Sequence, residues 1–169
     1  MPPQDDLRSL AHAKLVRHRV LAAQATLRRL LAEEETLDRD TTEHLLLDPS
    51  EEVRESLAAH TPFPDVLARL LTSQSALVRA GVAQNPRTTP EQRHTLTRDR
   101  SARVRATLLK FVDLDDEDLR LLAEDRSLNV RWWLATWPTT PREILELLLQ
   151  DPNEEVSRQA NVTLRHHRS

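Results

Sequence analysis

The stretch Glu52-Val53-Arg54-Glu55-Ser56-Leu57-Ala58 decides the fold, because versions of it return along the chain every 25 or 26 residues. Three clear copies follow it and a degraded copy ends the series. These are Leu77-Val78-Arg79-Ala80-Gly81-Val82-Ala83, Arg103-Val104-Arg105-Ala106-Thr107-Leu108-Leu109, Asn129-Val130-Arg131-Trp132-Trp133-Leu134-Ala135 and Glu155-Val156-Ser157-Arg158-Gln159-Ala160-Asn161. Shifting the pattern back by 26 residues aligns Leu27, Arg28, Leu31 and Ala32 with it. About six repeat units are therefore predicted.

Each repeat predicts two helices. Its apolar positions lie four residues apart, as Val53 and Leu57 do, which is typical of one helix face. A proline-containing break then ends this helix, and a second, shorter α- or 3₁₀-helix is expected from apolar residues such as Val66 and Leu70. The residues five positions before the Val column are acidic or carry a hydroxyl, which predicts N-caps at Asp48, Ser73, Asp99, Asp125 and Asp151.

A repeat this short cannot bury its apolar face alone, so neighbouring repeats must stack. The sequence predicts an all-α, right-handed helical repeat solenoid that forms one domain over residues 1–169, with the repeats over 22–169. Residues 1–21 are expected to begin a long capping helix. Apolar residues at heptad spacing in that helix allow an alternative, a coiled-coil homodimer. The preferred interpretation is a monomer in which this helix caps the end of the solenoid.

Composition excludes much familiar chemistry. The 169 residues include no Cys and one Gly, which excludes disulfides, thiolate metal sites and glycine-rich phosphate loops. The seven His form no HExxH motif, and no Ser or Thr lies in a nucleophile elbow. We therefore expect no enzyme activity, no cofactor and no metal. With no apolar stretch of membrane-spanning length and no secretory signal, a cytoplasmic protein without a membrane partner is expected.

The repeat resembles that of the leucine-rich repeat variant family, which is related in architecture to HEAT-like repeats. The resemblance rests on the pattern Asp-Pro-x-x-x-Val-Arg-x-x-Leu-Ala, followed by a proline-containing turn and Leu-x-x-Leu-x-x-Asp. The resemblance covers residues 22–169. It implies a superhelix of alternating α-helices and shorter, often 3₁₀, helices, with no catalytic residues to carry over. Some relatives carry a cysteine-ligated iron–sulphur module ahead of the repeats. The absence of Cys excludes that cofactor from this sequence.

One Arg recurs at the same helical position in five repeats, namely Arg28, Arg54, Arg79, Arg105 and Arg131. Three of these follow an acidic residue by six positions. The preferred interpretation is a ladder of Arg–Asp contacts between adjacent repeats, which uses the bidentate geometry of the guanidinium. Ser73 interrupts the acidic column and leaves Arg79 less obviously paired. The alternative is a row of cations that follows a phosphate backbone.

Aromatic and acidic residues interrupt the repeats near the C-terminal end. Trp132 and Trp133 replace small or polar residues of the other repeats. The sequence leaves two interpretations of Trp132: a partly covered structural side chain, or a hot spot that binds a protein or stacks on a nucleic-acid base. Phe111 and Trp137 share a column and are predicted to touch in the core. A run of carboxylates replaces one proline-containing turn and predicts a solvated helix cap that could contact a basic partner: Asp113, Asp115, Asp116, Glu117 and Asp118.

Together these features predict a non-catalytic protein-binding scaffold or adaptor whose partner the sequence does not identify. The candidate partner-binding residues are Trp132, Trp133, Arg79, Arg131 and Arg158. The alternative is a nucleic-acid-binding, HEAT-like solenoid that uses the Arg column and the Trp cluster. A net charge of −3 counts against it. A purely structural repeat would be favoured if Trp132 were fully buried.

Overall fold

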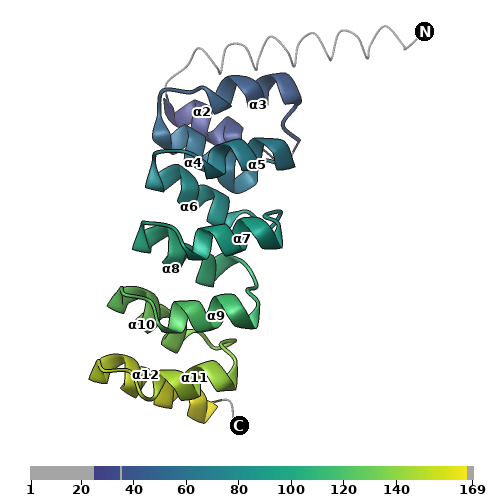
Figure 1. Ribbon diagram of the computed structural model, residues 1–169. Coiled ribbons are helices and arrows are strands. Elements are labelled where there is room, and N and C mark those ends of the chain that lie inside the picture. The colour runs from purple at the N-terminus through teal and green to yellow at the C-terminus, as the bar shows by residue number, and fades with distance from the viewer. Residues whose placement is uncertain (1–24, 35, 167–169) are drawn as a thin grey trace, which may run out of the picture. The chain divides into compact units, whose positions relative to one another are not determined.

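The computed structural model describes residues 25–34 and 36–166, in which all regular structure is α-helical (Figure 1). Two series of helices alternate along the chain. The first series is α2 (Ala25–Ala32), α4 (Glu51–His60), α6 (Ala76–Gln84), α8 (Ala102–Phe111), α10 (Leu128–Thr136) and α12 (Glu154–His166). The second is α3 (Arg39–Leu46), α5 (Pro64–Leu71), α7 (Pro90–Thr97), α9 (Asp116–Ala123) and α11 (Arg142–Leu148). The predicted all-α helical repeat solenoid is confirmed.

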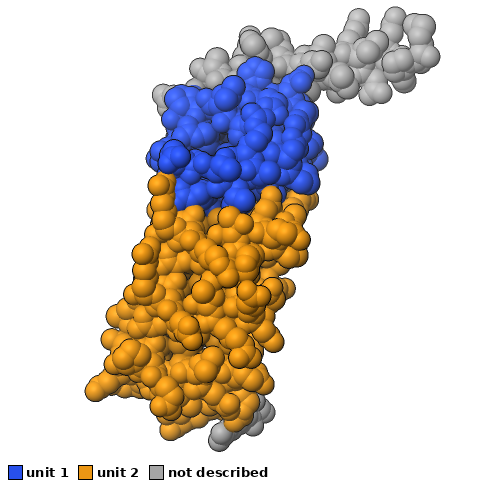
Figure 2. All heavy atoms as spheres, in the orientation of Figure 1, with its two compact units in different colours: residues 1–82 blue, residues 83–169 orange. Residues whose placement is uncertain are grey.

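The chain divides into two compact units, residues 1–82 and residues 83–169 (Figure 2). In the second unit, α8, α10 and α12 pack in sequence, and α9 contacts both α7 and α11. Residues 1–21, for which the sequence predicts the start of a capping helix and leaves a coiled-coil homodimer open, lie outside the described residues. None of the helices in the described part of the chain is long and apolar enough to cross a bilayer.

The second helix of each repeat is α rather than 3₁₀ over its seven or eight residues. Side-chain caps support the start of α3, α7 and α9, and a proline supports the start of α5 and of α7. Pro90 is the first residue of α7, and Thr89 and Gln92 form a reciprocal capping box before it. Tighter i→i+3 bonds occur at the ends of these helices. In the closing turn, the N–H of the next acidic-column residue donates to a Leu carbonyl, as Asp125 does to Leu122 at 3.2 Å.

The predicted N-caps are wrong by two residues. The N-caps of α4, α8 and α10 are Ser50, Ser101 and Ser127, each two positions after an acidic-column residue. In each case one oxygen of that Asp accepts the N–H of the Ser, at 2.7 to 2.9 Å, which makes an Asx turn ahead of the helix. The Asp side chains therefore fix the entry to the helix, and their second oxygens remain available.

The core follows the repeated Val and Leu positions. Every residue of the Val column is fully buried: Val53, Val78, Val104, Val130 and Val156. The single glycine marks a close approach of α6 to α4, because a Cβ at Gly81 would lie 2.9 Å from the Cβ of Ala58 and closer still to the carbonyl of Glu55. Only a residue without a side chain fits between those two helices.

Candidate partner-binding site

The Arg column forms a ladder with the acidic residue of the next repeat. Nε and Nη2 of Arg105 donate to the two carboxylate oxygens of Asp125, at 2.5 and 2.7 Å. Arg131 binds Asp151 in the same way at 2.6 and 3.2 Å, and Arg28 makes the equivalent pair with Asp48, also 20 residues later. The predicted ladder is therefore present in both units, and its geometry is bidentate.

The acidic residues six positions before Arg54, Arg105 and Arg131 play a different part. The backbone carbonyl of each, not its carboxylate, accepts a guanidinium donor: Nη1 of Arg131 donates to the carbonyl of Asp125 at 2.6 Å. In this arrangement Ser73 occupies the acidic position that Arg54 would use. Among the described carboxylates, Arg54 forms no ion pair, and it donates to the carbonyl of Asp48. The sequence predicted that Ser73 would leave Arg79 without its acidic partner, but in the structure the Arg that lacks this partner is Arg54.

Hydrogen bonding shifts the ionisation of the ladder residues. Burial alone would raise the pKa of Asp151, but hydrogen bonds from Arg131 and from the N–H of Asn153 hold that pKa below its usual value. The same balance lowers the pKa of Asp48 beside Arg28. In turn, the hydrogen bond to Asp151 raises the pKa of the Arg131 guanidinium. Both partners are therefore charged at neutral pH.

These contacts leave little of the Arg column for a partner. Arg79 is 6% exposed and donates to the backbone carbonyls of Ser73 and Gln74, at 2.7 and 3.0 Å. The guanidinium of Arg131 binds Asp151 and the backbone, as described above. Arg158 differs, since its side chain is 64% exposed and pairs with Glu155 in the same helix. The Arg column therefore does not form a row of exposed cations that could follow a phosphate backbone.

Both residues of the Trp pair are half-buried and pack against the core of the second unit. The rings of Trp132 and Trp133 meet edge to face, with centroids 5.2 Å apart and an interplanar angle of 78°. The ammonium of Lys110, on α8, lies 3.7 Å from the centroid of the Trp133 ring. Trp133 thus bridges α10 and α8, and Trp132 is not fully buried.

A hollow of about 360 Å³ lies beside this bridge, at the C-terminal ends of α8 and α10 and the turns that follow them. Its wall combines apolar side chains with the polar residues Lys110, Asp113, Thr139 and Thr140, and we call it the aromatic hollow. The apolar residues that line it include Leu109, Phe111, Leu114, Leu119, Leu134 and Trp137.

The predicted burial of Phe111 is wrong, since this side chain is 52% exposed. Leu109 occupies the buried position near the end of α8. Two residues correspond to about 200° of helix rotation, so Phe111 cannot share that face. Trp137 is half-buried. The two aromatic residues that were expected to meet in the core instead line the same hollow.

The acidic run begins at the aromatic hollow, and we call its exposed part the acidic rim. Asp113 lines the hollow, and exposed Asp115, Asp116 and Glu117 follow between the lining residues Leu114 and Leu119. Asp115 is the N-cap and accepts the N–H of Asp118 at 2.8 Å. The predicted solvated cap therefore describes these four residues. For Asp118 the prediction is wrong, because its side chain is 3% exposed.

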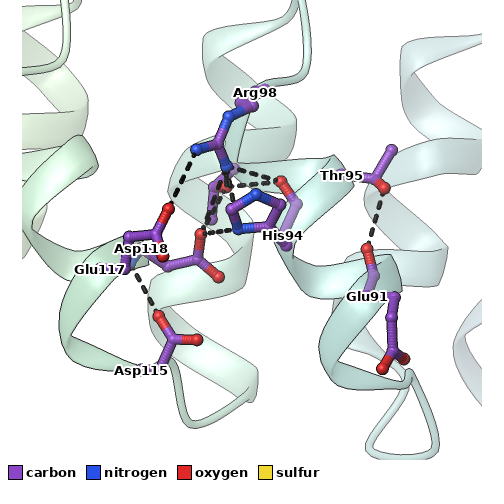
Figure 3. Close-up of polar contacts among 8 residues, drawn as sticks. Glu91, His94, Thr95, Arg98, Asp115, Glu117 and Asp118 are labelled. Carbon is purple, nitrogen blue, oxygen red and sulfur yellow. Dashed lines mark hydrogen bonds and ion pairs between the residues drawn. The ribbon is translucent and has the colours of Figure 1, made fainter.

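Helix α7 holds this acidic turn in place (Figure 3). The carboxylate of Asp118 accepts a hydrogen bond from Nδ1 of His94 at 2.9 Å and one from the hydroxyl of Thr97 at 3.0 Å. Nη1 of Arg93 donates to the backbone carbonyl of Asp113 at 2.7 Å. Both ends of the acidic segment are thus tied to the preceding repeat, which fixes the rim of the aromatic hollow.

Sequence reasoning missed the His94–Asp118 contact, although the repeat alignment contains a signal for it. Asp118 is the third residue of its short helix, and the same position is occupied by buried Val66 in α5 and buried Ile144 in α11. A carboxylate at a position that other repeats bury implies a polar partner nearby. No group of three or more His, Asp or Glu side chains is placed to hold a metal ion anywhere in the described part.

Comparison with solved structures agrees with this architecture. One solved structure, described as "a leucine-rich repeat variant with a novel repetitive protein structural motif", aligns with a TM-score of 0.63 and 29% sequence identity. The chain has the leucine-rich repeat variant fold. The alignment covers 85% of this chain and 60% of that protein.

No family model matches the sequence, and a search of curated proteins finds no match. The leucine-rich repeat variant fold therefore accounts for the stacked helix pairs. The function has to be argued from the site itself.

Proposed function

We propose that this protein is a non-catalytic repeat scaffold that binds another protein at the aromatic hollow. The proposal rests on the observation that an exposed Phe111 and a half-buried Trp137 line the same hollow. Aromatic side chains are enriched at the centres of protein interfaces, where they fill pockets and supply most of the binding energy. A repeat protein that only had to stack its own helices would gain nothing from leaving Phe111 in water.

The other two functions that the sequence allows receive less support. A nucleic-acid interface based on the Arg column would need free guanidinium groups, yet Arg105 and Arg131 are bound to carboxylates. A repeat without any binding surface would be expected to bury Trp132, which is half-buried. We expect titration with labelled DNA or RNA at low salt to show no binding that depends on Arg131.

Affinity capture with matched variants tests the proposal. Phe111→Asp places a charge in the aromatic hollow, and Leu128→Asp is the control. Leu128 is a similarly exposed apolar residue at the start of α10, where the helix dipole tolerates a carboxylate. We expect a protein captured by the wild-type chain from cells that express it to be lost with Phe111→Asp and retained with Leu128→Asp. Equal capture by all three chains, or capture of nothing, would contradict the proposal.

A further inference from the structure

We infer that the segment that binds at the aromatic hollow carries a large apolar side chain flanked by Lys or Arg. This inference rests on the proposed function and adds the chemistry of the partner. It follows from the combination of aromatic and aliphatic side chains in the hollow with the acidic rim beside it. The carboxylates alone would be an ordinary helix start, and the hollow alone would not select a partner.

The rim has an excess of negative charge. It has four exposed carboxylates: Asp113 lines the hollow, and Asp115, Asp116 and Glu117 follow it in sequence. Three cations lie near them, and each already has a contact. Lys110, which lines the hollow, lies over the ring of Trp133, Arg93 donates to a backbone carbonyl, and Arg98 lies near Glu117.

The rim carboxylates differ in how far they are already paired. Glu117 lies 3.7 Å from Arg98, whereas Asp113 and Asp116 form no ion pair with any charged side chain that the structure describes. Two carboxylates are therefore available to a basic partner. Cations on that partner would meet them at the edge of the contact, where complementary charge steers association and selects the partner.

The rim is also held in place before any partner arrives. The hydrogen bond of Asp118 to His94, and that of Arg93 to the carbonyl of Asp113, tie both ends of the acidic turn to α7. Asp115 closes the turn by capping α9. A surface fixed in this way loses little conformational entropy on binding, so a short segment can bind it.

The size of the hollow restricts what can enter it. A space of about 360 Å³ admits the side chains of a docked segment, not a folded domain. Leu, Phe or Trp on the partner would contact Phe111 and Trp137. Lys or Arg beside that anchor would then reach Asp113 and Asp116. The expected ligand is thus a short peptide segment with an apolar centre and basic flanks.

Selection from a phage-displayed random peptide library against the full chain tests this inference. We expect the enriched peptides to share a Leu, Phe or Trp next to Lys or Arg. A synthetic copy should bind in fluorescence anisotropy, and more weakly as salt rises from about 50 to about 300 mM. The double variant Asp113→Asn/Asp116→Asn should weaken binding about three- to tenfold.

A matched control removes the same charge elsewhere. Glu124→Gln/Glu154→Gln neutralises two exposed carboxylates outside the rim and should leave the affinity unchanged. If enriched peptides lack basic residues, or if Asp113→Asn/Asp116→Asn binds like the control, the inference is overturned and the proposed function stands. If no peptide is enriched, or if Phe111→Asp binds as tightly as wild type, the proposed function is overturned with it.

Discussion

Replacing Arg105 by Met tests whether the Arg–Asp ladder holds the repeats together. The guanidinium donates to both carboxylate oxygens of Asp125 and, at 2.5 Å, to the carbonyl of Asp99. The two side chains of the pair are 5% and 6% exposed. Arg105→Met keeps an apolar stem of similar length and removes every one of these donors.

The size of the effect follows from what the variant leaves behind. The buried carboxylate of Asp125 would keep one donor, the N–H of Ser127 at 2.7 Å, and lose its opposing charge. Breaking a buried ion pair by removing one partner costs about 3–5 kcal/mol, a large part of the roughly 5–15 kcal/mol that stabilises a domain. Arg54→Met is the matched control. Arg54 pairs with no described carboxylate, so the expected loss is about 1 kcal/mol, the value of one hydrogen bond.

Urea unfolding measures both losses as changes in the free energy of unfolding. Circular dichroism and tryptophan fluorescence should be recorded together, because coincident curves show that one transition is measured. We expect Arg105→Met to lose at least about 2 kcal/mol more than Arg54→Met. Adding Asp125→Leu to Arg105→Met should restore part of the loss, since it removes the unpaired buried charge. Similar losses in the two single variants would refute the account of the ladder.

Three further predictions concern other parts of the fold. Gly81→Ala should lower the melting temperature despite the higher helix propensity of Ala, because its Cβ would clash with α4 near Ala58; an unchanged or higher temperature would show that the helices move apart freely. Asp118→Ala should lower the free energy of unfolding in urea by about 1–3 kcal/mol, since it removes the buried carboxylate that accepts hydrogen bonds from Thr97 and His94, and an unaltered urea midpoint would argue against this. Ionised Asp151 stabilises the folded chain above its unfolded-state pKa of about 3.9, and this contribution is lost as pH falls through the lower folded-state pKa. Melting temperatures between about pH 5 and about pH 2 should therefore fall more steeply for wild type than for Asp151→Asn, and parallel curves would contradict that assignment.

The repeat architecture could be predicted because its signals are local and recur. The i, i+4 spacing of residues such as Val53 and Leu57 predicts each first helix without knowledge of its neighbours, and the fixed period predicts the stacking. The sequence predicted that the Arg column pairs with Asp residues of adjacent repeats, but not which Asp pairs with each Arg. Arg105 and Arg131 each have one Asp six residues before them and another 20 residues after them, as Asp99 and Asp125 flank Arg105. Only the stacked repeats determine that the later carboxylate is the partner.

The candidate site was harder to predict because it depends on where side chains point. Whether Phe111 faces the core depends on where α8 ends, and a shift of one residue rotates its position by about 100°. The burial of Asp118 against His94 depends on contacts between two helices more than 20 residues apart. A comparison of columns would have marked Asp118 as unusual, because Val66 and Ile144 occupy the same buried position.

Hydrogen–deuterium exchange of the full chain, with and without a peptide that the chain has selected, locates the binding surface. Bound peptide should slow exchange in residues 109–119 and 137–141, which contain the acidic rim and most of the residues that line the aromatic hollow. Exchange elsewhere in the second unit, including α12, should change little. Protection confined to other segments, with the hollow exchanging as fast as in the free chain, would contradict the claim that this surface binds the partner.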